Sequence, residues 1–387
     1  CEAGSLINRG NVASQDATVV ARLRQAGATI LGTTNTPEFL MAYVTENRLY
    51  GRTNNPWDLE CTPGGSSGGE SAAIAAGISA AGLGSDSGGS VRVPAHFTGI
   101  CALKPTPGRI PGRGHLPPNG GPFSILGAIG PMARTIADVT LLFQTLAGQD
   151  SLDPASPPLP LHSHSLDELK SIPIGYFEDD GLVPVTAATR EAVRAAVESL
   201  RKQGFRVEPF RPRALELARK LWWKFFVRCG AMFLEPAIRG HEDLLSPVLR
   251  NFLEIAHAEP PLGGEELLNA WAECDVIRGK LLKDMQQFPV LLTPVCALPA
   301  FRHEERAWKI EGQTIEYLDA MRYTQWFNLL AAPAAVVPVG RSPEGLPIGV
   351  QVVARPFEDE LALAVAAAVE RDFGYAPPPT LPGGNLR

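Results

Sequence analysis

Several patterns that define whole classes of protein are missing from this sequence of 387 residues. It has no excess of basic residues, because 35 Lys and Arg stand against 41 Asp and Glu, whereas a general nucleic-acid binder needs a basic face. No run of about 18 apolar residues occurs, which argues against a transmembrane helix. No basic segment followed by an apolar one opens the chain, so no signal peptide is visible. We therefore expect a cytoplasmic protein with no nucleic-acid partner and no membrane span.

The cysteines and histidines do not cluster. The six cysteines lie far apart and form no Cys-x-x-Cys pair, and the seven histidines are scattered. A metal site needs several such ligands at short spacing, so we expect no metal site and no cofactor. We expect the cysteines to be buried, reduced thiols. No internal repeat is visible, which argues against a repeat architecture.

Helical and strand-like segments alternate along the chain. Residues 15–31 predict a helix that ends at Gly27, followed by a short buried strand with the letters ATILG. Thr135 is placed to cap another helix that ends near Gly148. The remaining predictions are a helix from 70, a surface connection over 150–172, helices over 186–206 and 359–371, an aromatic helical region over 212–288, a strand over 289–300, a hairpin over 334–354 and a loose tail from 377. This alternation indicates the α/β class, with strands buried on both faces.

A stretch rich in glycine and serine, TPGGSSGGESAAIAAG, covers residues 62–77 and allows three interpretations. A flexible linker is disfavoured because structured, apolar segments flank the glycines on both sides. A Walker phosphate loop needs a lysine after its last glycine, where this chain has Glu70. The third interpretation is a catalytic serine. Residues 64–68 match the G-x-S-x-G nucleophile elbow, but with Asp319 as the acid no histidine follows, because the last histidine is His303.

A second loop of the same composition follows in the segment GLGSDSGGSVRVPAHFTGICALKPTPGR. Ser90 lies 24 residues after Ser66 and is preceded by Ser87, Gly88 and Gly89. Successive backbone N–H groups at glycines can converge on an anion, because no Cβ blocks the approach. That geometry suits an oxyanion hole beside a nucleophile. Two such loops, each with a serine, indicate a catalytic site more specifically than either loop alone.

The two loops together resemble those of the amidase signature family of serine hydrolases. The resemblance continues in the segments DATVVARLRQAGATILGTTNTPEF, AIGPMARTIADVTLLFQTLAGQD and GLPIGVQVVARPFEDELAL, so it covers most of the chain. It implies an α/β amidase signature fold, a mixed β-sheet core with helices on both faces. We expect a single domain over residues 1–387, with both serine loops at one edge of the sheet and a mostly helical section over about 186–288 covering the site.

The resemblance also implies the roles of individual residues. Ser90 matches the acyl-accepting nucleophile, and Ser66 matches a bridging serine on a cis peptide bond that relays a proton. A serine needs an adjacent base to become a good nucleophile. The remaining implied residues are the N–H groups of Ser87, Gly88 and Gly89 in the oxyanion hole, Asp86 and Arg92 as braces of the nucleophile loop, and Ser67 as a supporting donor.

The third member of the implied triad is a lysine in a K-D/E motif on a strand. Counted back from the position matching Ser5, it falls ahead of Cys1, and none of the lysines in this sequence stands in that motif. Lys104 belongs to the segment ALKPTPGR, whose role in the family is structural. We therefore expect that an N-terminal segment is missing and that residues 1–387 alone are catalytically impaired.

The family cleaves carboxylic amides, so we expect a small-molecule amide as substrate and a possible homodimer. The aromatic stretch 221–233 either packs in the core or lines a pocket for an apolar acyl or aryl group. Glu70 in GGSSGGE also matches the fatty-acid amide hydrolase branch.

Two alternatives remain open. One is a component of a glutamyl-tRNA amidotransferase, which would work only within a complex. The segment SILGAIGPMAR, however, lacks the sequence motif SLDQIGP associated with that component. The other is a non-catalytic relative that only binds ligands.

Overall fold

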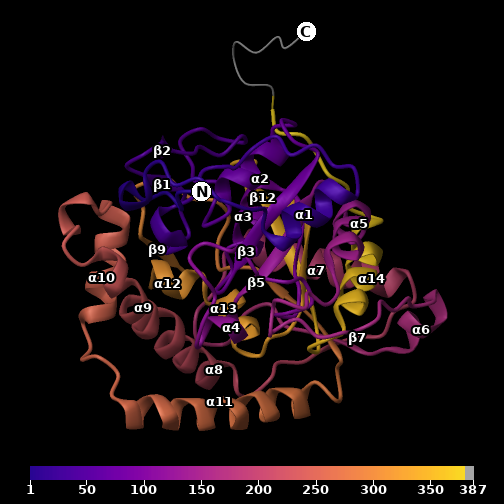
Figure 1. Ribbon diagram of the computed structural model, residues 1–387. Helices are drawn as coiled ribbons and strands as arrows, with labels where there is room; N and C mark the ends of the chain where they lie inside the picture. Colours follow the sequence, from indigo (N-terminus) through magenta and orange to yellow (C-terminus); the bar gives the residue numbers. More distant parts are fainter. Residues whose placement is uncertain (380–387) are drawn as a thin grey trace.

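The centre of the molecule is an eight-stranded sheet (Figure 1). The computed structural model describes residues 1–379. The strands are β3 (Ala81–Asp86), β4 (Cys101–Lys104), β5 (Ala128–Ala133), β6 (Ile174–Tyr176), β7 (Val207–Pro209), β8 (Val290–Pro294), β11 (Ala334–Arg341) and β12 (Pro347–Ala354). Their spatial order is β3-β5-β4-β11-β12-β8-β6-β7, which places β3 at one edge.

The sheet is mixed, as the resemblance implies. All pairs from β3 to β8 are antiparallel, whereas β6 pairs in parallel with both β8 and β7. The predicted hairpin is confirmed as β11–β12, and its turn is closed by the N–H of Gly345 donating to Ser342 O at 2.9 Å. Two small antiparallel pairs lie apart from the sheet: β1 (Glu46–Asn47) with β2 (Gly51–Arg52), and β9 (Ala307–Ile310) with β10 (Gln313–Glu316).

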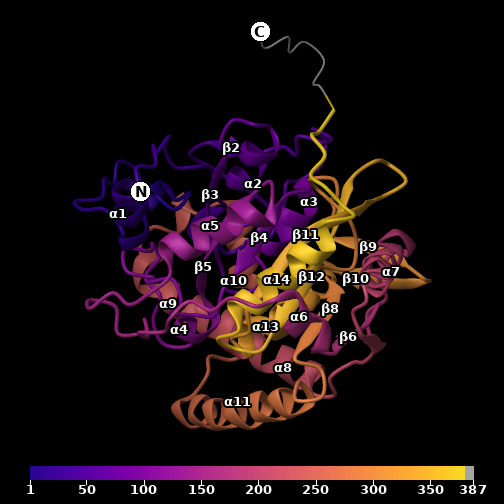
Figure 2. The same ribbon diagram turned by 90° about the vertical axis from the view of Figure 1, so that its right-hand side faces the viewer.

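Each face of the sheet carries its own hydrophobic core, because neighbouring residues of a strand point to opposite faces. Leu291 packs into one core and Leu292 into the other. Helices that bury side chains in the core of Leu292 are α1 (Thr18–Gln25), α5 (Ile136–Leu146), α6 (Leu166–Ser171), α7 (Ala187–Lys202) and α14 (Asp359–Glu370). Figure 2 shows α14 lying across β11 and β12. The two cores thus share one sheet, and the predicted α/β class is confirmed.

The other face carries both serine loops and most of the aromatic residues. Helices that bury side chains there are α2 (Gly68–Ala75), α3 (Arg92–Thr98), α4 (Phe123–Leu126), α8 (Leu215–Trp222), α9 (Cys229–Ile238), α10 (Pro247–His257), α11 (Gly264–Asp284), α12 (Tyr317–Ala320) and α13 (Arg322–Leu329). A π-helical turn, Trp223–Arg228, joins α8 to α9. The expected helical section over 186–288 is therefore divided: α7 covers the opposite face, and only α8–α11 lie on the face of the serine loops (Figure 1).

The ends of several helices follow the predicted signals. Thr135 caps α5 by accepting a hydrogen bond from the N–H of Asp138 at 3.1 Å. Gly27 ends α1 in the left-handed conformation, with the N–H of Ala28 donating to Leu23 O in the pattern of a Schellman cap. The surface connection over 150–172 was incompletely predicted, because it contains α6 with a capping box at Ser165.

The predicted strand at ATILG is wrong. Residues 28–32 form no strand, and Leu31 is 72% exposed. A strand needs a partner for its backbone N–H and C=O groups, and none pairs with this segment in the part of the chain that is described. The predicted tail begins at 377, and residues 380–387 lie outside the described residues. None of the helices within 1–379 combines the length and apolar character needed to cross a membrane.

Candidate active site

The two serine loops meet at the edge of the sheet formed by β3. Ser66 lies two residues before α2, and Ser90 lies in the turn that connects β3 to α3. The N–H of Ser67 donates to the backbone oxygen of Ser90 at 3.1 Å, so the loops are joined directly. The Gly65–Ser66 peptide bond is cis. Ser66 and Ser90 are both buried.

Close backbone packing explains one of the glycines beside Ser66. A Cβ atom on Gly65 would lie 2.5 Å from the backbone oxygen of Val44 and 2.6 Å from its nitrogen. Neither atom belongs to a flexible side chain, so no residue with a Cβ fits without a shift of the backbone. The loop can thus lie against the segment 42–45, and Thr45 adds a hydrogen bond from Oγ1 to Gly64 O at 2.8 Å.

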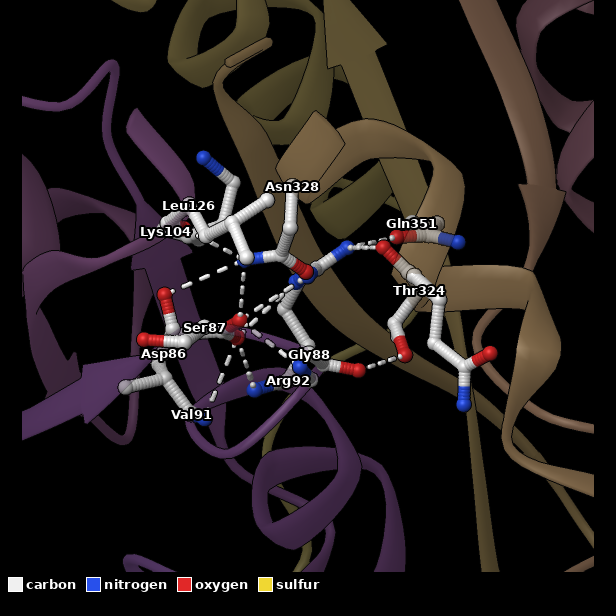
Figure 3. Close-up of polar contacts among 12 residues, drawn as sticks. Asp86, Ser87, Gly88, Val91, Arg92, Lys104, Leu126, Thr324, Asn328 and Gln351 are labelled. Carbon is white, nitrogen blue, oxygen red and sulfur yellow. Dashed lines mark hydrogen bonds and ion pairs between the residues drawn. The ribbon is translucent and has the colours of Figure 1, made fainter. Parts of the chain in front are cut away.

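The Ser90 loop is folded around the carboxylate of Asp86. Oδ1 accepts from the N–H of Gly89 at 2.7 Å and from Nδ2 of Asn328 at 3.0 Å, while Oδ2 accepts from the N–H of Val91 at 3.2 Å. Both oxygens also accept from Arg92, at 2.9 and 3.0 Å, and the two side chains are fully buried (Figure 3). Burial alone would raise the pKa of Asp86, but the charge and hydrogen bonds of Arg92 hold this pKa well below its ordinary range.

Two side chains and one backbone oxygen that the sequence analysis did not identify complete this network (Figure 3). Nη1 of Arg92 donates to Oε1 of Gln351 at 3.1 Å and to the backbone oxygen of Thr324 at 3.0 Å. Asn328 also donates to the backbone oxygens of Asp86 and Leu126. A signal for Gln351 was available, because it is the one polar side chain in the strand IGVQVVA.

The backbone groups ahead of Ser90 do not all match the predicted oxyanion hole. The N–H of Gly89 already donates to Asp86, a charge-assisted bond that holds it away from any other anion. In this structure the N–H therefore braces the loop, whereas the sequence analysis expected it in the oxyanion hole. The N–H groups of Ser87 and Gly88 have no acceptor among residues 1–379 and are the two predicted donors left for a ligand.

Lys104 lies at the end of β4 and is fully buried. Burial, with the neighbouring charge of Arg92 as the next contribution, lowers the pKa of Lys104 to about 7. Its Nζ donates to the backbone oxygen of Pro105 at 2.9 Å, and no hydrogen bond links it to Ser66 or Ser90 in the described part of the chain. These contacts agree with the structural role expected for it.

Ser90 lines a cavity of about 240 Å³. Its wall is largely apolar, with Phe226, Phe252 and Leu318 among the lining side chains, and Glu46 and Arg306 add charged groups. Of the aromatic stretch 221–233, Phe226 and Val227 line this cavity. Trp222 and Phe225 are buried in the core, whereas Met232 and Phe233 are 45% and 54% exposed.

Two residues of α2 do not line the cavity, and one of them, Glu70, was singled out in the sequence. Glu70 is on α2, and its Oε2 accepts from Oγ1 of Thr34 at 2.9 Å. Ser71 donates to Gly68 O within the same helix, at 3.1 Å. Within residues 1–379, no three His, Cys, Asp or Glu side chains are grouped closely enough to hold a metal ion.

Comparison with known proteins gives one family. The family model described as Amidase matches residues 1–363. An indoleacetamide hydrolase of Bradyrhizobium diazoefficiens is 33% identical over 373 residues, which cover 95% of this chain and 70% of that protein. A component of the glutamyl-tRNA(Gln) amidotransferase of Anaeromyxobacter sp. strain K is 33% identical over 408 residues, covering 98% of this chain and 81% of the relative.

A solved structure has the same fold. It comes from work on a vestigial protein complex and the evolutionary origins of an s-triazine catabolic enzyme, and it aligns with a TM-score of 0.86 at 31% identity. The alignment covers 98% of this chain and 82% of the other. The sheet, the paired serine loops and these similarities lead to one conclusion: the chain belongs to the amidase family, within the amidase signature enzymes.

Proposed function

We propose that this protein hydrolyses small carboxylic amides with Ser90 as the nucleophile. The observation that carries the proposal is that Ser90 lies in the wall of an apolar cavity, in a loop braced by a buried ion pair and bonded to the loop of Ser66. Activity as an amide hydrolase is supported by the family and by the hydrolase among the relatives. The serine mechanism rests on the positions of these two residues.

The proposed reaction is acyl transfer in two steps. Oγ of Ser90 attacks the amide carbonyl carbon, and its proton passes through Ser66 to the lysine that the family resemblance implies as base. The carbonyl oxygen becomes an oxyanion that accepts from the N–H groups of Ser87 and Gly88. The C–N bond then breaks, the amine leaves with a proton, and water hydrolyses the acyl ester to a carboxylic acid.

The cavity favours an apolar acyl or aryl group on the substrate. Phe226, Phe252 and Leu318 offer apolar contact to the acyl side of an amide, which suits a flat or aliphatic group. An aryl-acetamide is the class suggested by the indoleacetamide hydrolase among the relatives. The second candidate is the glutaminase reaction of an amidotransferase component, which the 33% identical Anaeromyxobacter protein supports.

The test uses the natural full-length protein, a fluorophosphonate probe and a panel of amides. We expect the probe to label Ser90 and the Ser90→Ala variant to stay unlabelled, with Ser124→Ala, at an exposed position of α4, as the matched control. Indole-3-acetamide and phenylacetamide should be hydrolysed faster than glutamine. Labelling that persists in Ser90→Ala would contradict the assignment of the nucleophile. Preferential release of ammonia from glutamine would favour the second candidate.

A further inference from the structure

Among residues 1–379, the backbone oxygen of Ser87 has one side-chain donor, which comes from a distant part of the chain. Nε1 of Trp222 donates to Ser87 O at 2.8 Å. Trp222 is the last residue of α8 and is completely buried. An indole N–H is a donor only, so this side chain satisfies its hydrogen-bonding capacity entirely on the Ser87 carbonyl.

The orientation of this carbonyl decides where the N–H of Gly88 points. A trans peptide unit is planar, and its C=O and N–H point in opposite directions. The Ser87–Gly88 bond is not among the cis bonds of the described chain. By holding Ser87 O, Trp222 therefore directs the N–H of Gly88 to the opposite side, where it has no acceptor within residues 1–379.

The next peptide unit shows the contrasting case. The oxygen of Gly88 accepts from the hydroxyls of Tyr43, at 2.8 Å, and Thr324, at 2.5 Å, while the N–H of Gly89 donates to Asp86. That unit is fixed at both ends and keeps no donor for a ligand. The Ser87–Gly88 unit is fixed at one end, by Trp222, and its other end is open.

Packing of the indole against the loop supports the same role. A Cβ atom on Gly88 would lie 2.7 Å from Cζ2 of Trp222 and 2.9 Å from Oη of Tyr43. The indole also stacks on Phe226, with ring centroids 4.8 Å apart and an interplanar angle of 10°. Since Phe226 lines the cavity of Ser90, Trp222 connects the cavity wall to the peptide that carries the open donor.

We infer that Trp222 is a positioning residue, which holds the Ser87–Gly88 peptide so that the N–H of Gly88 faces the oxyanion formed on attack by Ser90. The inference rests on the proposed function, because it needs an oxyanion at this site. The aromatic stretch 221–233 would thus contribute to the reaction in two ways. Phe226 offers an apolar surface to the substrate, and the buried Trp222 positions the peptide that carries the oxyanion donor.

The test replaces the indole N–H and keeps the ring. In the natural full-length protein, Trp222 is exchanged for the analogue in which sulfur replaces the indole N–H, and separately Trp222→Phe is made. Trp223→Phe is the matched control, because the neighbouring Trp223 packs against Arg219 instead of the loop. The measurements are kcat and KM on phenylacetamide, the melting temperature, and the inhibition constants of phenylacetic acid and a benzyl trifluoromethyl ketone. The serine oxygen adds to the carbonyl carbon of the ketone, and the ketone oxygen becomes an oxyanion.

We expect the sulfur analogue to lower kcat by about 10- to 100-fold with little change in KM, because loss of one oxyanion donor removes about 10²- to 10³-fold and a misdirected donor loses part of this. Binding of the trifluoromethyl ketone should weaken in parallel, while binding of phenylacetic acid and the control variant should stay near the parent values. If Trp222→Phe fails to fold, the sulfur analogue alone decides.

Unchanged kcat and unchanged ketone binding in the sulfur analogue would overturn the inference and leave the proposed function intact. A fall in melting temperature without a selective loss of ketone binding would overturn it as well, because it would indicate packing alone. If the parent protein neither hydrolyses amides nor is labelled at Ser90, the proposed function fails, and the inference fails with it.

Discussion

Asp86 and Arg92 form an ion pair with no solvent exposure, in which Nη2 and Oδ1 are 2.9 Å apart. The two residues bracket the loop that carries Ser90, and the pair is bonded to α13 and β12 through Asn328 and Gln351. An isolated buried charge is strongly disfavoured, so each partner depends on the other. The loop is thereby fixed to the sheet by charge and by hydrogen bonds at the same time.

The first prediction concerns this pair. Asp86→Asn leaves the Arg92 charge buried without its partner, and we expect the free energy of unfolding to fall by about 3–5 kcal/mol. Labelling of Ser90 should be lost in parallel, since the loop loses its brace. Denaturant unfolding provides the measurement. The control is Asp16→Asn, which breaks a surface pair with Arg24 and should cost less than about 1 kcal/mol. Equal losses in the two variants would show that burial of the pair is unimportant.

The second prediction uses the pH dependence of stability. The pKa of Lys104 is lowered to about 7 by burial, followed by the charge of Arg92, and an unfolded lysine has a pKa of about 10.4. Between these values the unfolded chain binds the proton and the folded chain does not, so stability should rise with pH across this window. Lys104→Met removes the titrating group. The unfolding free energy of this variant minus that of the parent protein should therefore fall as pH rises from about 7 to 10.

A flat profile would mean that Lys104 stays charged in the folded protein across this window, and a reverse slope would mean that folding raises its pKa; either result would contradict the prediction. Lys170→Met is the control, because it removes a lysine side chain from the exposed surface.

The sequence predicted the fold well where local signals and the global pattern agree. Thr135 begins one helix and Gly27 ends another through local hydrogen bonds, which the residue types at these positions indicate. The prediction of a strand at ATILG failed because a short apolar run does not show whether a partner strand exists. The site was predicted as far as adjacent residues define it. The contacts between site residues that are distant in the sequence were not predicted.

Trp222 reaches Ser87 across 135 positions, and Asn328 reaches Asp86 across 242, so these pairings follow from tertiary packing that the motif spacing does not encode. The contact of Gly89 with Asp86 was not predicted for a related reason. Which N–H group of a glycine loop faces a ligand depends on backbone orientation, and here the carboxylate of Asp86 decides it.

The third prediction separates the serines of the first loop. Ser66→Ala should lower kcat on phenylacetamide by several orders of magnitude, because relay of the proton and activation of Ser90 are lost together. Ser71→Ala is the control: its hydroxyl bonds to Gly68 O inside α2, and kcat should stay within about twofold of the parent. Similar rates for Ser66→Ala and the parent protein would exclude the relay.

The fourth prediction concerns the acyl side of the cavity. Phe226→Ala removes an aromatic wall of the Ser90 cavity, and we expect kcat/KM for phenylacetamide to fall about tenfold or more, since apolar contact of this size contributes about 1–3 kcal/mol. Acetamide, which is too small to reach that wall, should be affected much less. Phe233→Ala is the matched control, because that ring is 54% exposed and does not line the cavity. Circular dichroism and the melting temperature of each variant distinguish a change of specificity from unfolding. An equal loss on both amides would place Phe226 in the support of the loop, through its stack on Trp222, and would remove it from substrate recognition.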